Sequence, residues 1–114
     1  MRSMILAAAL LAAGPADAFI TTYSQWEGMP EEARVSYIMG MFDGLVEFGA
    51  FSLSMGTAAY HYSDCLQKSR MDNWQLAANL RAFVAREPFY QTKSVALALL
   101  GYLAALCGPE PLNR

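Results

Sequence analysis

The sequence predicts an all-α protein: a small bundle of three to four helices with one disulfide, preceded by a cleaved signal peptide. Apolar residues recur at three- and four-residue steps in separate segments of the chain, which is the spacing of one helix face. Proline, glycine and capping residues stand at the ends of those segments. No segment shows the sustained two-residue alternation of apolar and polar side chains that indicates a half-buried strand.

The first 18 residues have the three parts of a secretory signal. Arg2 supplies a short positive region, residues 4–13 are apolar, and Ala16-Asp17-Ala18 has the small side chains that signal peptidase accepts. An apolar helix of this length spans about 15 Å, roughly half of a bilayer core, so cleavage is favoured over a membrane anchor. We expect a mature chain of residues 19–114 that forms a single helical domain and is periplasmic or secreted. The alternative is a buried N-terminal helix of a cytosolic protein.

The charge balance gives no sign of a nucleic-acid surface. Eight basic and ten acidic residues give a net charge of −2, and loss of Arg2 and Asp17 with the signal leaves this value unchanged. No run of lysine and arginine occurs in the chain. We expect no nucleic-acid partner, no membrane association after signal cleavage, and no cofactor.

Two cysteines, Cys65 and Cys107, remain after removal of the signal. In an oxidising compartment an isolated pair is most simply a disulfide, and this one would close a segment of 43 residues. The chain has one histidine and no CxxC spacing. Both facts disfavour the rival interpretations, a metal pair or a reactive thiol.

The first predicted helix runs from about residue 30 to residue 49. Pro30 suits the first helical position, and Glu31 and Glu32 place negative charge in the first turn, where the helix dipole favours it. The apolar stripe of this helix consists of Val35, Ile38, Met41, Phe42, Leu45 and Phe48. Gly40 and Gly44 share one face, and we expect them to allow another helix of the same chain to pack closely against it.

Two segments are less regular. Residues 19–29 are expected to be a short lead-in anchored by Trp26. Residues 50–71 are expected to be a partly helical excursion that the disulfide holds at its end. Gly56, Ser63 and Asp64 favour a break within it.

A second clear helix follows the excursion. Asp72 and Gln75 have the spacing of a capping box at its start, and Pro88 ends it because the residue before a proline avoids the helical region. Its inward stripe consists of Leu76, Ala77, Leu80, Phe83 and Val84, while Arg81 and Arg86 face solvent.

The last predicted helix begins after Thr92 or Ser94, either of which can cap it, and ends at Gly108-Pro109. Its stripe consists of Val95, Leu99, Tyr102, Leu103 and Leu106. Because its other positions are also apolar, we expect it to be buried on all sides, by the other helices or by a second subunit.

No constellation of side chains indicates catalysis. His61, Ser63 and Asp64 are too close in sequence for a nucleophile relay, whose members come from distant segments. Asp43 and Glu47 lie four residues apart on one helix, where a solvated acidic face explains them better than a catalytic pair. We therefore predict that the protein is not an enzyme and has no metal site.

The order of motifs along the chain resembles a known family. Cys65-Leu66 is followed by Trp74-Gln75-Leu76, by Phe-Val-Ala-Arg-Glu-Pro at residues 83–88, and by an alanine- and leucine-rich helix ending in Leu106-Cys107. Upstream are Arg-Val-Ser-Tyr-Ile-Met-Gly at residues 34–40 and then Asp43-Gly44. Over residues 26–107 the pattern resembles the small periplasmic immunity proteins of type VI secretion systems, the Rap/Tai type, which neutralise cell-wall amidase toxins.

The resemblance implies an all-helical domain, a disulfide between Cys65 and Cys107, frequent homodimerisation, and inhibition by plugging the active-site cleft of a toxin. Family members often carry a proline soon after the first cysteine and another just before the last one. Gln67 and Leu106 stand at or near those places here. No contact residue is carried over from the family.

Two functions remain open at this point. The first is a non-enzymatic periplasmic binding protein of the immunity type, with a secreted amidase toxin as its protein partner. Its contact candidates are Tyr60, His61 and Tyr62, which we expect to be exposed, because interface hot spots are rich in aromatic residues. The second is a periplasmic structural or stress protein, such as a small disulfide-bonded helical chaperone. A composition with 16% charged residues and one histidine provides few groups for an acid-triggered protein of that kind.

Overall fold

The computed structural model describes residues 21–51 and 56–109, and every regular element within these ranges is helical. The elements are α3 (Tyr23–Glu27), α4 (Glu31–Phe51), α5 (Gly56–Ser69), α6 (Asn73–Arg86), the 3-10 helix η1 (Pro88–Thr92) and α7 (Val95–Cys107). A disulfide joins Cys65 to Cys107. The predicted all-α bundle and its disulfide are therefore confirmed, while the predicted signal peptide lies outside the described residues.

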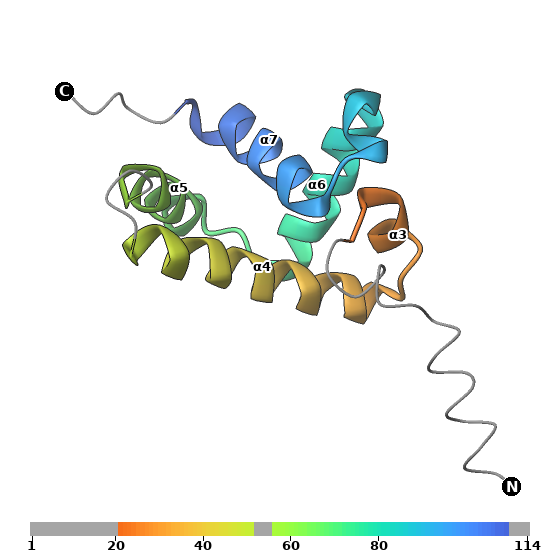
Figure 1. The fold of residues 1–114 in the computed structure, drawn as a ribbon, viewed down its shortest axis with the longest axis horizontal. Coiled ribbons are helices and arrows are strands. Elements are labelled where there is room, and N and C mark those ends of the chain that lie inside the picture. The colour runs from red at the N-terminus through yellow and green to blue at the C-terminus, as the bar shows by residue number, and fades with distance from the viewer. Residues whose placement is uncertain (1–20, 52–55, 110–114) are drawn as a thin grey trace, which may run out of the picture.

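The helices are arranged around α4, which runs along one side of the molecule (Figure 1). α3 lies beside the N-terminal end of α4, and α5 packs along its C-terminal part. α6 packs against α4, and α7 runs from η1 and α6 towards α5 on the side away from α4. The buried core lies where α3, α4, α6 and α7 meet.

The lead-in before α4 is more ordered than its sequence indicates. Thr22 and Gln25 form a capping box that starts α3, a short helix that the sequence analysis did not predict. Trp26 is fully buried, and its Nε1 donates a hydrogen bond of 3.1 Å to the carbonyl oxygen of Arg34. The predicted anchoring role of Trp26 is thus confirmed, because its ring packs in the core and its polar atom is satisfied.

The apolar stripe of α4 is confirmed at its start and is wrong at its end. Val35 and Ile38 are buried, but Phe48 is 62% exposed. Each three-residue step turns a helix position by about 300°, so two such steps from Phe42 rotate Phe48 by roughly 120° away from the core side. The close packing expected at Gly40 and Gly44 is also wrong, since a Cβ atom at either position would meet no atom within 4 Å.

The segment expected to be partly helical contains a helix of 14 residues, α5. Ser63 and Asp64, which were expected to favour a break, lie inside it. The helix ends instead at Ser69, and Arg70 follows in the left-handed region with φ of 57°. Packing against α4 and α7 outweighs the modest intrinsic preference of these polar residues for non-helical backbone.

The predicted start and end of α6 are confirmed. Asp72 Oδ1 accepts a hydrogen bond from the Gln75 amide at 2.8 Å, and the Gln75 side chain accepts one from the Asp72 amide at 2.8 Å. The helix ends at Arg86, and Pro88 opens η1, which the sequence analysis did not predict. All five residues of its predicted stripe are buried: Leu76, Ala77, Leu80, Phe83 and Val84.

The last helix, α7, is buried on one side only. Ser94 caps it by accepting a hydrogen bond from the Leu97 amide, and Gly108 follows it with φ of 78°, a backbone conformation that favours glycine. Four of the five predicted stripe residues are buried: Val95, Leu99, Tyr102 and Leu103. Leu106 and Leu97 are 42% and 43% exposed, so the expectation of burial on all sides is wrong for the single chain.

Gly101 explains how η1 packs against α7. A Cβ atom at this position would overlap the phenol ring of Tyr90. That ring also lies 5.3 Å from the ring of Phe83, measured between centroids. The absence of a side chain at Gly101 therefore allows Tyr90 to bridge η1, α6 and α7.

Candidate partner-binding groove

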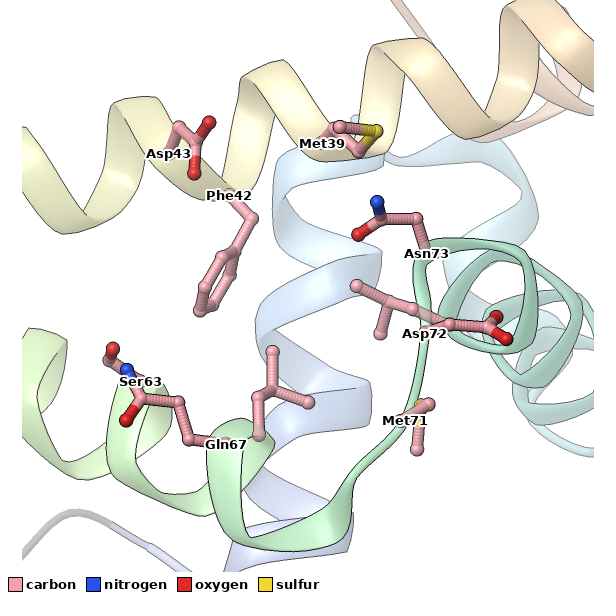
Figure 2. A pocket seen from close by; sticks show the side chains of 10 residues that line it. Met39, Phe42, Asp43, Ser63, Gln67, Met71, Asp72 and Asn73 are labelled. Atoms are coloured by element: carbon pink, nitrogen blue, oxygen red, sulfur yellow. The ribbon is translucent and has the colours of Figure 1, made fainter.

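A groove of about 220 Å³ lies between α4, α5 and the start of α6 (Figure 2). Figure 2 shows Met39 and Asp43 on α4 at one side of it, Ser63 and Gln67 on α5 across from them, and Asp72 and Asn73 at the end formed by α6. The lining residues are Met39, Phe42, Asp43, Ser63, Leu66, Gln67, Met71, Asp72, Asn73 and Leu76.

The link between α5 and α6 shapes one end of this groove. Ser69 Oγ donates a hydrogen bond of 2.7 Å to the Leu66 carbonyl oxygen, and the left-handed backbone at Arg70 turns the chain out of α5. Asp72 then starts α6 through its capping box. This short link places Met71 and Asp72 at one end of the groove.

Met71 connects the groove to the core. Its sulfur accepts weak hydrogen bonds from Asn79 Nδ2 at 3.5 Å and from the Tyr102 hydroxyl at 3.8 Å. Sulfur is a weak acceptor, so each contact contributes little. Met71 therefore lies between the groove and the core residue Tyr102.

The groove combines an apolar floor with a polar rim. Phe42, Leu66 and Leu76 supply buried or half-buried apolar surface. The rim side chains of Asp43, Ser63, Gln67 and Asn73 make no hydrogen bond or ion pair with other described residues. No lysine or arginine lines the groove, so its charge comes from the carboxylates of Asp43 and Asp72.

The size of the groove limits what it can hold. Small-molecule sites typically enclose about 300–1,000 Å³, and this groove is smaller. An apolar centre surrounded by polar groups is the anatomy of a protein–protein interface. A groove of this size has room for one or two amino-acid side chains.

A second hollow of about 340 Å³ lies between α6 and α7 and includes the exposed Leu106. Its polar lining consists of Asn79, Arg86 and Tyr102, besides apolar residues. Asn79 and Tyr102 already contact the Met71 sulfur, which leaves Arg86 as the one polar side chain there without an assigned contact among the described residues. This hollow offers fewer groups for recognition than the first groove.

The aromatic triplet in α5 does not form one surface. Tyr60 is 74% exposed, as expected, but His61 and Tyr62 are half-buried. His61 Nε2 lies 3.0 Å from the Gly108 carbonyl oxygen, a hydrogen bond in which a protonated Nε2 donates. Tyr62 packs against the core and lines a small apolar pocket with residues of α4 and α7. Exposure of the whole triplet is therefore wrong, and Tyr60 alone presents a large free ring.

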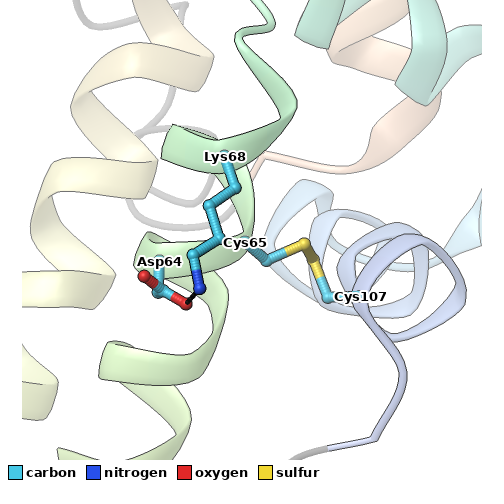
Figure 3. Close-up of polar contacts among 4 residues, drawn as sticks. All are labelled: Asp64, Cys65, Lys68 and Cys107. Atoms are coloured by element: carbon cyan, nitrogen blue, oxygen red, sulfur yellow. Dashed lines mark ion pairs between the residues drawn. A yellow bond between two sulfur atoms is a disulfide. The ribbon is translucent and has the colours of Figure 1, made fainter.

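The disulfide joins α5 to the end of α7 (Figure 3). The Cα atoms of Cys65 and Cys107 are 5.8 Å apart. One residue before Cys65, Asp64 Oδ2 forms an ion pair of 2.9 Å with Lys68 Nζ. This carboxylate raises the pKa of the Lys68 ammonium. The Lys68 side chain is 77% exposed, so solvent screens this pair and it adds little to stability.

The side chains that could suggest catalysis are engaged separately. His61 contacts Gly108, Asp64 pairs with Lys68, and Ser63 lines the groove, so the three form no relay. Within residues 21–51 and 56–109, no group of three or more histidine, cysteine or acidic side chains is placed to hold a metal ion. None of the helices in that part of the chain is both long enough and apolar enough to cross a membrane.

The groove was not predicted from the sequence. The sequence indicates a solvated face at Asp43, which is exposed, and a helix cap at Asp72, but neither pattern predicts a groove. The capping box was a usable signal, because it fixes where the chain turns into α6 and hence where Asp72 stands. The approach of Asp43 to that turn depends on how α4 and α6 pack, which no local pattern encodes.

Comparisons with protein-family models, with curated proteins and with solved structures find no match for this chain.

Proposed function

We propose that this chain is an exported, non-enzymatic binding protein that recognises a protein partner through the groove between α4, α5 and α6. The observation that carries the proposal is the groove itself, with an apolar floor and four polar side chains that have no partner among the described residues. A disulfide and a hydrogen bond from His61 hold the α5 wall of the groove against α7.

The motif pattern of residues 26–107 favours one kind of partner, a secreted cell-wall amidase toxin, with the chain acting as its immunity protein in the periplasm. The signal-like N-terminus and the disulfide agree with export to an oxidising compartment. A preformed helical surface suits inhibition, because a rigid binder loses little conformational entropy on association.

The test is co-expression with the secreted toxin encoded beside this gene. We expect survival of the host, a stable complex in size-exclusion chromatography, and loss of amidase activity on purified peptidoglycan. Gln67→Trp should fill the groove and weaken the complex, whereas Gln91→Trp, on exposed η1 away from the groove, should not. Absence of any complex with the unmodified chain would refute the proposal.

A second candidate, a small periplasmic chaperone, is favoured by the exposed apolar side chains. Seven large ones are exposed among the described residues, and they are distributed over α4, α5, α6, η1 and α7: Met39, Phe48, Tyr60, Trp74, Phe89, Leu97 and Leu106. Such a distribution suits many weak contacts with unfolded clients. Suppression of client aggregation that strengthens on acidification, without a specific partner, would support this function over the first.

A further inference from the structure

We propose that the groove between α4, α5 and α6 recognises a partner segment in which an apolar side chain is flanked by lysine or arginine. This inference rests on the proposed binding function and specifies the chemistry of the partner. It follows from the charge of the groove, from its polar side chains without a partner among the described residues, and from the exposed ring of Tyr60 on its α5 side.

The charge of the groove is one-sided. Asp43 lies on α4 and Asp72 is the cap residue before α6, and neither makes an ion pair with a described residue. Lys68, which follows the lining residue Gln67, is already paired with Asp64. Two unpaired carboxylates beside a low-polarity floor favour a cation, and like-charged partners would be repelled.

The unpaired polar groups fit a peptide backbone. One oxygen of Asp72 accepts from the Gln75 amide, and its other oxygen is left for a partner. The Asn73 and Gln67 amides and the Ser63 hydroxyl supply donors and acceptors on both sides of the floor. A partner segment that buried its central side chain here could form hydrogen bonds between its backbone groups and these side chains. Such bonds offset the cost of removing the backbone groups from water.

The α5 wall of the groove continues beyond its lining residues. Tyr60 lies three residues before Ser63 and seven before Gln67, spacings that share one face of α5. Its exposed ring extends that wall for an aliphatic side chain or a cation to pack against.

The test uses the oxidised full chain labelled with ¹⁵N and two acetylated, amidated tripeptides, Lys-Leu-Lys and Glu-Leu-Glu, titrated by NMR. We expect shifts centred on the amides of the groove residues with the lysine peptide, and several-fold weaker binding with the glutamate peptide. Equal binding of the two peptides, or shifts confined to another surface, would overturn the inference. Groove shifts that depend on protein concentration without peptide would assign the groove to a second copy and overturn it as well.

Charge-neutral variants separate the groove from general electrostatics. Asp43→Asn and Asp72→Asn should each weaken the lysine peptide by up to about fivefold, the range of a partly exposed ion pair. Asparagine also caps helices well, so α6 should remain intact in Asp72→Asn. Glu87→Gln, an equal charge change at the far end of α6, should leave the affinity unchanged.

The same variants distinguish this inference from the proposed function. If the protein partner binds the unmodified chain, Asp43→Asn and Asp72→Asn with equal affinity, the charge requirement is wrong and the binding function stands. If no partner binds the unmodified chain while the peptides behave as expected, the binding function as proposed is wrong and the groove chemistry stands.

Discussion

Removal of the disulfide should destabilise the chain mainly through its unfolded state. The bond joins residues 42 apart in sequence, so it closes a segment of 43 residues counting both cysteines. The loop-entropy relation gives about 4 kcal/mol of stabilisation for a loop of this length at 25 °C. Since small domains are stable by about 5–15 kcal/mol, this one bond supplies a large fraction of the total. We expect the double variant Cys65→Ala/Cys107→Ala to lose about that amount.

The assay is urea unfolding followed by circular dichroism. For a slope of about 2 kcal/mol per molar urea, the midpoint should fall by about 2 M. His61→Ala is the matched control, because it removes the hydrogen bond to Gly108 and leaves the covalent loop closed. It should cost about 1 kcal/mol. A loss below about 1 kcal/mol in the double variant, with an unchanged slope, would refute the loop-closure account.

Three further predictions concern stability. Gly44→Ala should raise the free energy of unfolding by up to about 1 kcal/mol, because helix propensity improves and the added methyl meets no atom. Gly101→Ala should lower it by about 1–3 kcal/mol, because the added methyl overlaps Tyr90. Urea unfolding of both variants checks this contrast, and equal effects would contradict it. Asp72→Ala should cost about 1 kcal/mol through loss of the α6 cap, with Asp72→Asn near neutral, as measured by thermal unfolding. Burial, assisted by the Glu27 carboxylate, raises the pKa of Tyr23, so the folded chain keeps this proton while the unfolded chain releases it. Stability from this group is therefore complete below about pH 10 and lost as the pH rises above that value, and Tyr23→Phe should flatten this alkaline loss in unfolding titrations.

Features set by short-range chemistry could be predicted from the sequence. The capping box at Asp72 and Gln75 is recognised from a spacing of three residues. The disulfide between Cys65 and Cys107 is predicted from the presence of two cysteines and the expectation of an oxidising compartment. Features that depend on whether a neighbouring helix covers a residue could not be predicted from the sequence. Leu106 follows the periodicity of a buried face, yet it lies near the end of α7, where its side chain remains 42% exposed. Gly44 carries no information on whether a neighbour exists, because a bare helix face looks the same in sequence with or without one.

The groove also depends on how helices far apart in the sequence pack together. The disulfide is the one part of that packing that could be predicted from the sequence. Cys65 immediately precedes Leu66, a residue of the groove floor, and Ser63 and Gln67 stand one turn or less away on the same helix. The bond to Cys107 therefore ties to α7 the helix that carries two of the four rim residues, Ser63 and Gln67. α4 holds that wall from the other side, through side chains such as Phe42 that also line the groove. α5 therefore lies between the disulfide on one side and α4 on the other, and its rim groups stand across the groove from Asp43. Under the proposed binding function, this arrangement would allow a small surface to discriminate between partners by charge.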